Sequence, residues 1–208
     1  SRTGPSLTDR AGGERAIMRP SRPRSPMPDP HLTCELDELG IVRLTFTNGD
    51  LNMYDLQMRD ELIAALELVH TVPEVRVVVL ASAGKHFCVG ADLKEFGTAE
   101  TIFEARWIRW ARDPWIPLWR CPVPTIAAIN GFALGSGMEM AMLCDYRLAA
   151  PGAALGLPEA SLGMLPAAGG TQSLARTVGA DRAVPPVVLG TRIPAAEAER
   201  LGMVEVVD

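Results

Sequence analysis

Cysteine and histidine are scarce in this chain, and their scarcity excludes several kinds of site. The four cysteines lie far apart without a CxxC pair, and the three histidines form no metal-ligand pattern with them. We therefore expect no metal site and interpret the cysteines as free thiols in a reducing compartment. The chain also lacks a GxSxG nucleophile elbow, a complete GxGxxG fingerprint and a Walker pattern.

Positive charge is in short supply outside the first 30 residues. The net charge is -5, and residues 1–30 hold six arginines against three acidic residues, so this segment is +3 and the remainder -8. Only two lysines occur, Lys85 and Lys94. Because non-specific binding of nucleic acid depends on Lys and Arg neutralising phosphates, the acidic body predicts no nucleic-acid partner.

Residues 1–30 contain no aromatic residue and six prolines, which predicts a disordered Pro/Arg-rich tail ahead of a core domain over 31–208. The alternative is an Arg-rich targeting peptide, although the prolines oppose the amphipathic helix that such peptides form. We expect a cytoplasmic protein, or a mitochondrial one if this segment is a targeting peptide. The apolar core of a secretory signal is absent.

One apolar run, residues 125–144, is long enough to span a bilayer. It contains Asn130, a glycine-rich turn and Glu139 near its middle. An acidic residue at mid-membrane costs about 2.5–3.5 kcal/mol even on the lenient insertion scale. A buried strand, a turn and a helix explain this run better than a membrane span.

Strand patterns alternate with helix patterns along the body, which predicts parallel βαβ units of the α/β class. Helices are expected over 55–70, 99–112, 137–144 and 171–178, and strands over 41–46, 75–82, 123–130, 146–150 and, as a short one, within 151–170. Pro185 and Pro186 fall inside a further helical pattern, 181–189, which is therefore expected to start late or to kink.

Two isolated glutamates are the candidate catalytic residues. Glu139 is the only charged residue between Arg120 and Asp145, and Glu159 is the only one between Arg147 and Arg176. A pair of positioned carboxyl groups is suited to general acid–base chemistry, and a dry setting raises their pKa values toward neutrality. Spacing alone equally allows that each glutamate caps a helix or points to water.

Two glycine-punctuated junctions, "HFCVGAD" and "GFALGSG", are the candidate oxyanion hole. Glycine allows a sharp turn and a close backbone approach to a ligand, and a helix start behind the turn leaves N–H groups free. Two such N–H groups facing one oxygen would stabilise developing negative charge. Two ordinary tight turns would give the same pattern.

Taken together, these motifs resemble the crotonase superfamily, the enoyl-CoA hydratases and isomerases. The resemblance covers residues 40–208 and is strongest in "GKHFCVGADLKEF", "PVPTIAAINGFALGSGMEMAMLCDYRLAA" and "LGLPEASLGMLPAAGGTQSLARTVG", with a looser match in "LNMYDLQMRDEL". It implies a crotonase-like ββα spiral of stacked β-sheets with surrounding helices, usually assembled as trimers or dimers of trimers. It also implies an acyl-CoA substrate, with coenzyme A as part of the substrate and no separate cofactor.

The resemblance also assigns expected roles to residues. The backbone N–H groups of Ala91 and Ser136 would bind the thioester oxygen, and Glu139 and Glu159 match the two glutamates that distinguish the hydratases. Coenzyme A would pass along the backbone of Val89, Ala91 and Leu93, with Lys94 near a phosphate; a solvated surface lysine is the alternative for Lys94. The implied reaction is hydration of a trans-2-enoyl-CoA to a 3-hydroxyacyl-CoA.

Several departures from the family pattern keep other activities open. Ser136 stands where the family often has glycine, Asp50 stands near an expected basic residue, and the chain ends at Asp208 without the usual C-terminal helices. The alternatives are double-bond isomerisation and a catalytically weak binding or scaffold protein. All four tryptophans, residues 107, 110, 115 and 119, lie in the segment that lines the acyl pocket in relatives, although core or subunit packing would also explain them.

Overall fold

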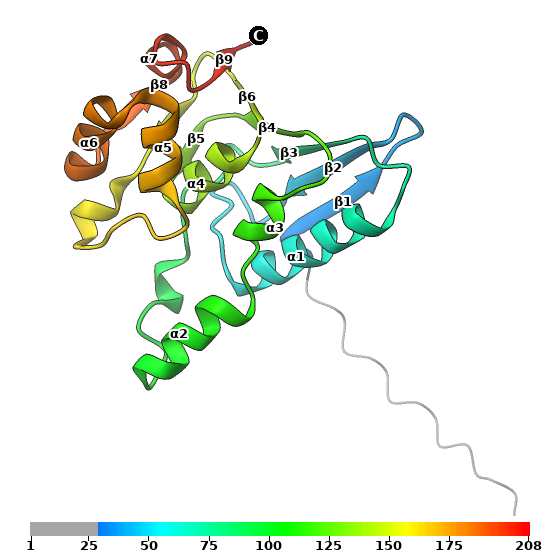
Figure 1. Cartoon of the computed structure of the whole chain (residues 1–208), viewed down its shortest axis with the longest axis horizontal. Helices are drawn as coiled ribbons and strands as arrows, with labels where there is room; N and C mark the ends of the chain where they lie inside the picture. Colours follow the sequence, from blue (N-terminus) through cyan, green and yellow to red (C-terminus); the bar gives the residue numbers. More distant parts are fainter. Residues whose placement is uncertain (1–28) are drawn as a thin grey trace, which may run out of the picture.

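Two β-sheets and the helices around them make up the part of the chain that the computed structural model describes, residues 29–208 without the side chains of 108–110 (Figure 1). The larger sheet has the strand order β1-β2-β3-β4-β6-β9, and the smaller has the order β5-β7-β8. The pairs β1–β2 and β7–β8 are antiparallel and the others are parallel. The strands are β1 (Leu32–Leu36), β2 (Ile41–Phe46), β3 (Val77–Ser82), β4 (Thr125–Ile129), β5 (Phe132–Leu134), β6 (Tyr146–Ala149), β7 (Ala154–Gly156), β8 (Arg192–Pro194) and β9 (Glu205–Val206).

The helices alternate with the strands along the chain. They are α1 (Leu56–Thr71), α2 (Ile102–Ala111), α3 (Trp115–Trp119), α4 (Ser136–Leu143), α5 (Gly170–Val178), α6 (Ala180–Leu189) and α7 (Ala195–Arg200), with 3-10 turns η1 (Leu93–Glu95) and η2 (Pro158–Leu162). Helix α1 begins where the Asp55 side chain accepts a hydrogen bond from the Met58 amide at 2.8 Å. Figure 1 shows α2 extending away from the sheets, whereas α4 lies close to them.

The chain changes sheets at Gly131, between β4 and β5. Its φ of +54° is a left-handed conformation, and a Cβ there would lie 2.3 Å from the Lys85 carbonyl oxygen. The next pass repeats the pattern, since β6 belongs to the larger sheet and β7 to the smaller. Each of these two passes therefore supplies one strand to each sheet before the next helical segment, and the β5–α4 junction follows the first crossing between the sheets.

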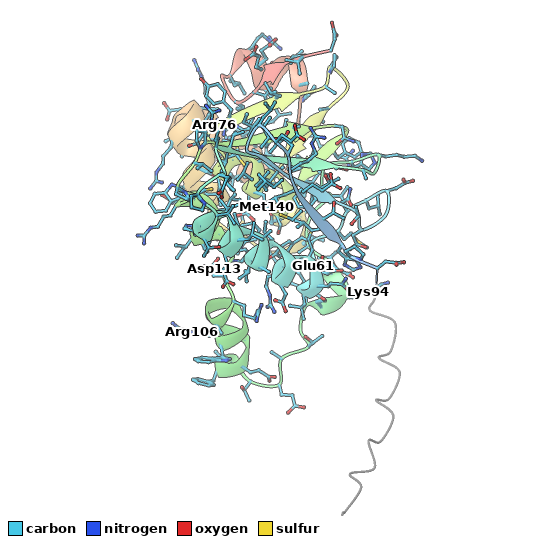
Figure 2. All side chains as sticks on the ribbon, turned by 90° about the vertical axis from the view of Figure 1, so that its right-hand side faces the viewer. Glu61, Arg76, Lys94, Arg106, Asp113 and Met140 are labelled. Atoms are coloured by element: carbon cyan, nitrogen blue, oxygen red, sulfur yellow. The ribbon has the colours of Figure 1, made fainter. Side chains whose placement is uncertain are left out.

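The core lies on the inner faces of both sheets and fixes the position of α4. Val42, Leu44, Val78 and Leu80 on β2 and β3 are fully buried. Met140 on α4 is also fully buried, and Figure 2 shows it near the centre of the molecule. Because α4 is covered by core residues, the side chains of its first turn are held in defined positions.

Gly137, in the first turn of α4, packs directly on the Cys88 backbone. A Cβ at this position would lie 2.2 Å from the Cys88 carbonyl oxygen. We expect Gly137→Ala to reduce the free energy of unfolding by about 1–3 kcal/mol, because two backbone segments must separate. Urea unfolding measures this loss. Gly152→Ala is the control, since a Cβ at position 152 would have no heavy atom within 4 Å; equal midpoints for the two variants would contradict close packing.

The structure confirms most predicted elements and corrects one. Helix α6 begins at Ala180 and continues through both Pro185 and Pro186, so the expectation of a late start is wrong. The helix packs against α5 and η2, and this tertiary packing offsets the two lost backbone donors. The elements that were not predicted are β1, which is largely exposed, and the short β5, β8, β9, α3 and α7, of two to six residues each.

The predicted tail falls almost wholly on residues 1–28, which lie outside the described residues. Its disorder and the location that depends on it remain predictions. Within residues 29–208, no helix combines the length and the apolar character needed to cross a bilayer.

Candidate active site

A cavity of about 500 Å³ opens where α4, η2 and the β3–η1 loop meet the start of α1. Its lining includes all four residues that the sequence assigns to the chemistry, Ala91, Ser136, Glu139 and Glu159. They come from three segments of the chain, the β3–η1 loop, α4 and η2, and the fold brings them to one cavity. The rest of the lining is mainly apolar, so charges inside the cavity are poorly screened by water.

The loop that carries Ala91 is held between two neighbouring segments. On one side, the amide of Tyr54 donates to the Gly90 carbonyl at 2.9 Å, and the amide of Asp92 donates to the Tyr54 carbonyl at 2.8 Å. On the other side, the amide of Leu134 donates to the Cys88 carbonyl at 2.9 Å. These bonds leave the N–H of the intervening Ala91 unused.

Asn52 fixes the beginning of the same loop. It is fully buried with φ +47°, and its Nδ2 donates to the Ser82 hydroxyl at 2.8 Å and to the His86 carbonyl at 2.9 Å. This buried amide gives a structural reason for the asparagine in the loosely matching segment "LNMYDLQMRDEL". Its role is to position the loop, and it does not line the cavity.

The amides of Ala91 and Ser136 both lie at the cavity wall. Ser136 is the first residue of α4, so its N–H precedes the helical hydrogen-bond ladder. Among residues 29–208, no acceptor contacts either N–H. Gly135, which precedes Ser136, has φ +52° and ψ −123°, a conformation that favours glycine and turns the chain sharply into the helix. The two amides can therefore donate to a ligand oxygen.

Glu139 lies one turn into α4 and is only 2% exposed. Its Oε1 accepts from the amides of Ala168 at 2.7 Å and Gly170 at 2.8 Å, at the start of α5. Gly170 permits this approach, because a Cβ there would lie 3.0 Å from the same oxygen. These charge-assisted bonds offset the cost of burying a carboxylate in an otherwise apolar stretch.

Glu159 lies on η2, close to Gly135 at the start of α4. Its Oε1 lies 3.1 Å from the Cβ position of Gly135, and its buried Oε2 has no hydrogen-bond partner among the described residues. Burial raises the pKa of Glu159 above the ordinary value of 4.5, and a backbone hydrogen bond opposes the shift. An unsatisfied buried oxygen at a cavity wall is suited to contact a ligand or a water molecule.

The raised pKa of Glu159 predicts a pH-dependent contribution to stability. The folded state binds the proton more tightly than the unfolded state, so the glutamate destabilises the fold increasingly as pH rises from 4.5 through the raised pKa. We expect Glu159→Gln to be more stable relative to wild type at pH 8 than at pH 4, as measured by denaturant unfolding. The exposed Glu67→Gln provides the control. A pH-independent difference would contradict the burial of this carboxyl group.

The predicted coenzyme A residues lie only partly at the cavity. Val89, Ala91 and Leu93 line it, whereas Lys94 is exposed and absent from the lining. Figure 2 shows Lys94 at the periphery of the molecule, and its backbone amide donates to Asp92 Oδ1 at 3.0 Å. Asp50, which lies near the position expected to be basic, forms an exposed ion pair with Lys85 at 3.2 Å.

Only one of the three tryptophans with described side chains lines the cavity. Trp115 is 8% exposed and packs against Tyr54, with ring centroids 5.2 Å apart. Trp107 and Trp119 are 63% and 58% exposed, and the side chain of Trp110 lies outside the described residues. Of these tryptophans, Trp115 alone lies at the cavity, and an aromatic acyl pocket stays a prediction.

Two arginines at the cavity were not identified from the sequence. Arg59 follows Asp55 by one turn of α1, and Arg112 lies just after α2; both line the cavity together with Glu95. Local sequence patterns give no signal for them, because they meet only through the packing of two distant segments. Asp60 contacts both guanidinium groups.

Comparison with known proteins shows the family and the fold of the chain. The family model for enoyl-CoA hydratase/isomerase matches residues 37–208. The chain is 38% identical over 180 residues to the fatty acid oxidation complex subunit alpha of Colwellia psychrerythraea. The matched region covers 85% of this chain and 25% of that protein. The chain is also 43% identical over 145 residues to the enoyl-CoA hydratase domain-containing protein 2, mitochondrial, of Mus musculus, covering 69% of the chain and 49% of that protein.

The structure also superposes on an enoyl-CoA hydratase of Mycobacterium smegmatis with a TM-score of 0.80 and 32% identity, covering 86% of this chain and 70% of that one. This similarity confirms the predicted crotonase fold. The chain spans only about a quarter of the length of the Colwellia relative, and about half of the mouse one.

Proposed function

Because the chain belongs to the enoyl-CoA hydratase/isomerase family, we propose that it catalyses the reversible addition of water to a trans-2-enoyl-CoA thioester. The observation that carries this proposal is the shared cavity. Glu139 and Glu159 line it together with the unoccupied amides of Ala91 and Ser136. Isomerisation moves one proton between two carbons, for which one carboxyl group suffices. Hydration adds a hydroxyl group to one carbon and a proton to the other, which suits one carboxyl group as base and a second as acid.

The two amides would act on the thioester oxygen. When water oxygen bonds to C3, the electrons of the C2–C3 double bond move toward the thioester and place negative charge on its oxygen. The N–H groups of Ala91 and Ser136 stabilise that charge without reorganisation, because the β5–α4 turn and the β3–η1 loop already hold them. Free amides contribute more in a largely apolar cavity than in water.

The two glutamates would exchange protons with opposite ends of the former double bond. Glu139 accepts a proton from the attacking water as the oxygen bonds to C3, while protonated Glu159 delivers its proton to C2 of the enolate. Burial favours the protonated form of Glu159 by raising its pKa, which suits this donor role. Proton exchange through water then returns both groups to their starting states, and the product is a 3-hydroxyacyl-CoA.

A panel of short, long and aromatic trans-2-enoyl-CoA thioesters tests the reaction type, with products identified by mass spectrometry. Hydration adds the mass of one water, whereas isomerisation gives a new enoyl-CoA of unchanged mass. Products of unchanged mass would assign the chain to the isomerases. Failure to bind any acyl-CoA, together with a stable protein partner, would support the scaffold alternative.

A further inference from the structure

Arg59 and Arg112 line the same cavity as the two glutamates, and both contact Asp60. Arg59 Nε and Nη2 each lie 2.9 Å from Asp60 Oδ1, and Arg112 Nε lies 2.8 Å from the same oxygen. Asp60 does not line the cavity. One carboxylate therefore lies behind two cations that face the cavity, and it balances only one of them.

Arg59 is placed where an uncompensated charge is costly. Its side chain is only 13% exposed, and its neighbours in the lining include Tyr54, Phe96, Pro114 and Trp115. Among residues 29–208, Asp60 is the only ion-pair partner of either arginine. Among the described residues no guanidinium nitrogen is both buried and unpaired, so the N–H groups that do not contact Asp60 remain accessible to a ligand in the cavity.

The other carboxyl groups on this wall, Asp55 and Glu95, form no ion pair with either arginine among the described residues. Asp55 is occupied by the amide of Met58 at 2.8 Å, by Asn48 Nδ2 at 3.0 Å and by His31 Nδ1 at 2.8 Å. Glu95 accepts from the Leu56 amide at 3.2 Å. Burial is the largest influence on Glu95 and raises its pKa; the charges of Asp55 and Asp92 add to this shift, whereas the hydrogen bond from Leu56 and the charge of Arg59 oppose it.

We infer that the preferred acyl group carries a carboxylate at the end remote from the thioester, so that the substrate class is a dicarboxylic enoyl-CoA. This inference rests on the proposed function and deepens it. The free N–H donors of Arg59 and Arg112 bind the terminal carboxylate, while the apolar lining packs against the methylene groups. Planar guanidinium groups match a carboxylate in two-point geometry. A terminal methyl group would offer these N–H groups no acceptor.

Two 2-enoyl-CoA thioesters of equal chain length, one ending in a carboxylate and one in a methyl group, test the inference. We expect kcat/KM to be about 10- to 100-fold higher for the carboxylate-ended thioester, which is the effect usually produced by a charge-assisted hydrogen bond. Arg112→Met should remove most of this preference, because Asp60 then balances Arg59 alone. Asp60→Asn should increase the preference, because it leaves both cations unbalanced.

Arg106→Met is the matched control, since Arg106 is exposed on α2 and extends from the body of the molecule in Figure 2. It should leave the preference unchanged. Equal or better use of the methyl-ended thioester by wild type would overturn the inference. A second result would also overturn it: Arg112→Met lowers kcat/KM equally for both thioesters and also weakens the binding of free coenzyme A. The arginines would then bind coenzyme A phosphates and not the acyl group.

Binding measurements keep this test independent of the reaction. Calorimetry with the corresponding saturated thioesters should give a Kd about 10- to 100-fold lower for the carboxylate-ended compound. If neither enoyl thioester is hydrated but this difference is found, the proposed hydration fails and the carboxylate preference stands. If hydration proceeds and the Kd values are equal, the hydration stands and the carboxylate preference fails.

Discussion

Replacing Glu139 with glutamine is expected to lower kcat for hydration by about 10²- to 10⁴-fold, the usual contribution of a positioned acid or base. A glutamine side-chain oxygen can still accept from the amides of Ala168 and Gly170, so the fold and the geometry of α5 should be retained. What is lost is the ability to take a proton from water. Steady-state kinetics with a short trans-2-enoyl-CoA measures the effect.

Binding separates this chemical role from a structural one. The Kd for a saturated acyl-CoA should change less than about threefold in Glu139→Gln, as expected for an interaction made only in the transition state. Glu159→Gln should behave similarly, because the reaction needs both carboxyl groups. The exposed Glu67→Gln should match wild type in every assay. Near-normal turnover by either active-site variant would refute its proposed role.

Replacing Ser136 with proline should reduce kcat by about 10²- to 10³-fold, the cost of losing one oxyanion-hole donor. Proline is tolerated at the first position of a helix, where its missing N–H is not needed for the ladder, and Ser136 occupies that position in α4. The backbone of Gly135, at φ +52° and ψ −123°, is the mirror image of the extended conformation that residues before proline adopt. Glycine adopts this mirror conformation readily.

The matched control is Ser136→Ala, which keeps the N–H and removes only the hydroxyl. It should retain wild-type kcat, since the proposed donor is the backbone. Circular dichroism and thermal unfolding of Ser136→Pro should remain close to wild type. If Ser136→Ala lost as much activity as Ser136→Pro, the hydroxyl would be the functional group and the proposed oxyanion hole would be incorrect.

The sequence predicts those parts of the site whose signals are local. Glu139 and Glu159 are identifiable because an isolated charge in an apolar stretch needs a partner or a function. The glycines at the two turns mark sharp changes of direction, and the structure accounts for them by positive φ at Gly90 and Gly135. The identity of the donors that hold Glu139 was not predictable, because they come from the start of α5, a separate segment further along the chain.

Other features depend on packing between distant segments. Arg59 and Arg112 both contact Asp60 because the end of α2 packs near α1. The periodic pattern of apolar residues within each helix does not predict a contact between these two distant segments. The same reason explains the error at α6, where packing against α5 and η2 retains a helix through two prolines. The sequence does not distinguish Trp115 from Trp107, yet Trp115 is buried and Trp107 is exposed.

A crystal structure of the chain with a bound 3-hydroxyacyl-CoA tests the central claim most directly. We expect the thioester oxygen to lie about 2.7–3.1 Å from the backbone nitrogens of both Ala91 and Ser136. We also expect the 3-hydroxyl group to lie within hydrogen-bond distance of the carboxyl groups of Glu139 and Glu159. An acyl group bound outside this cavity, or a thioester oxygen that contacts neither amide, would contradict the proposed site.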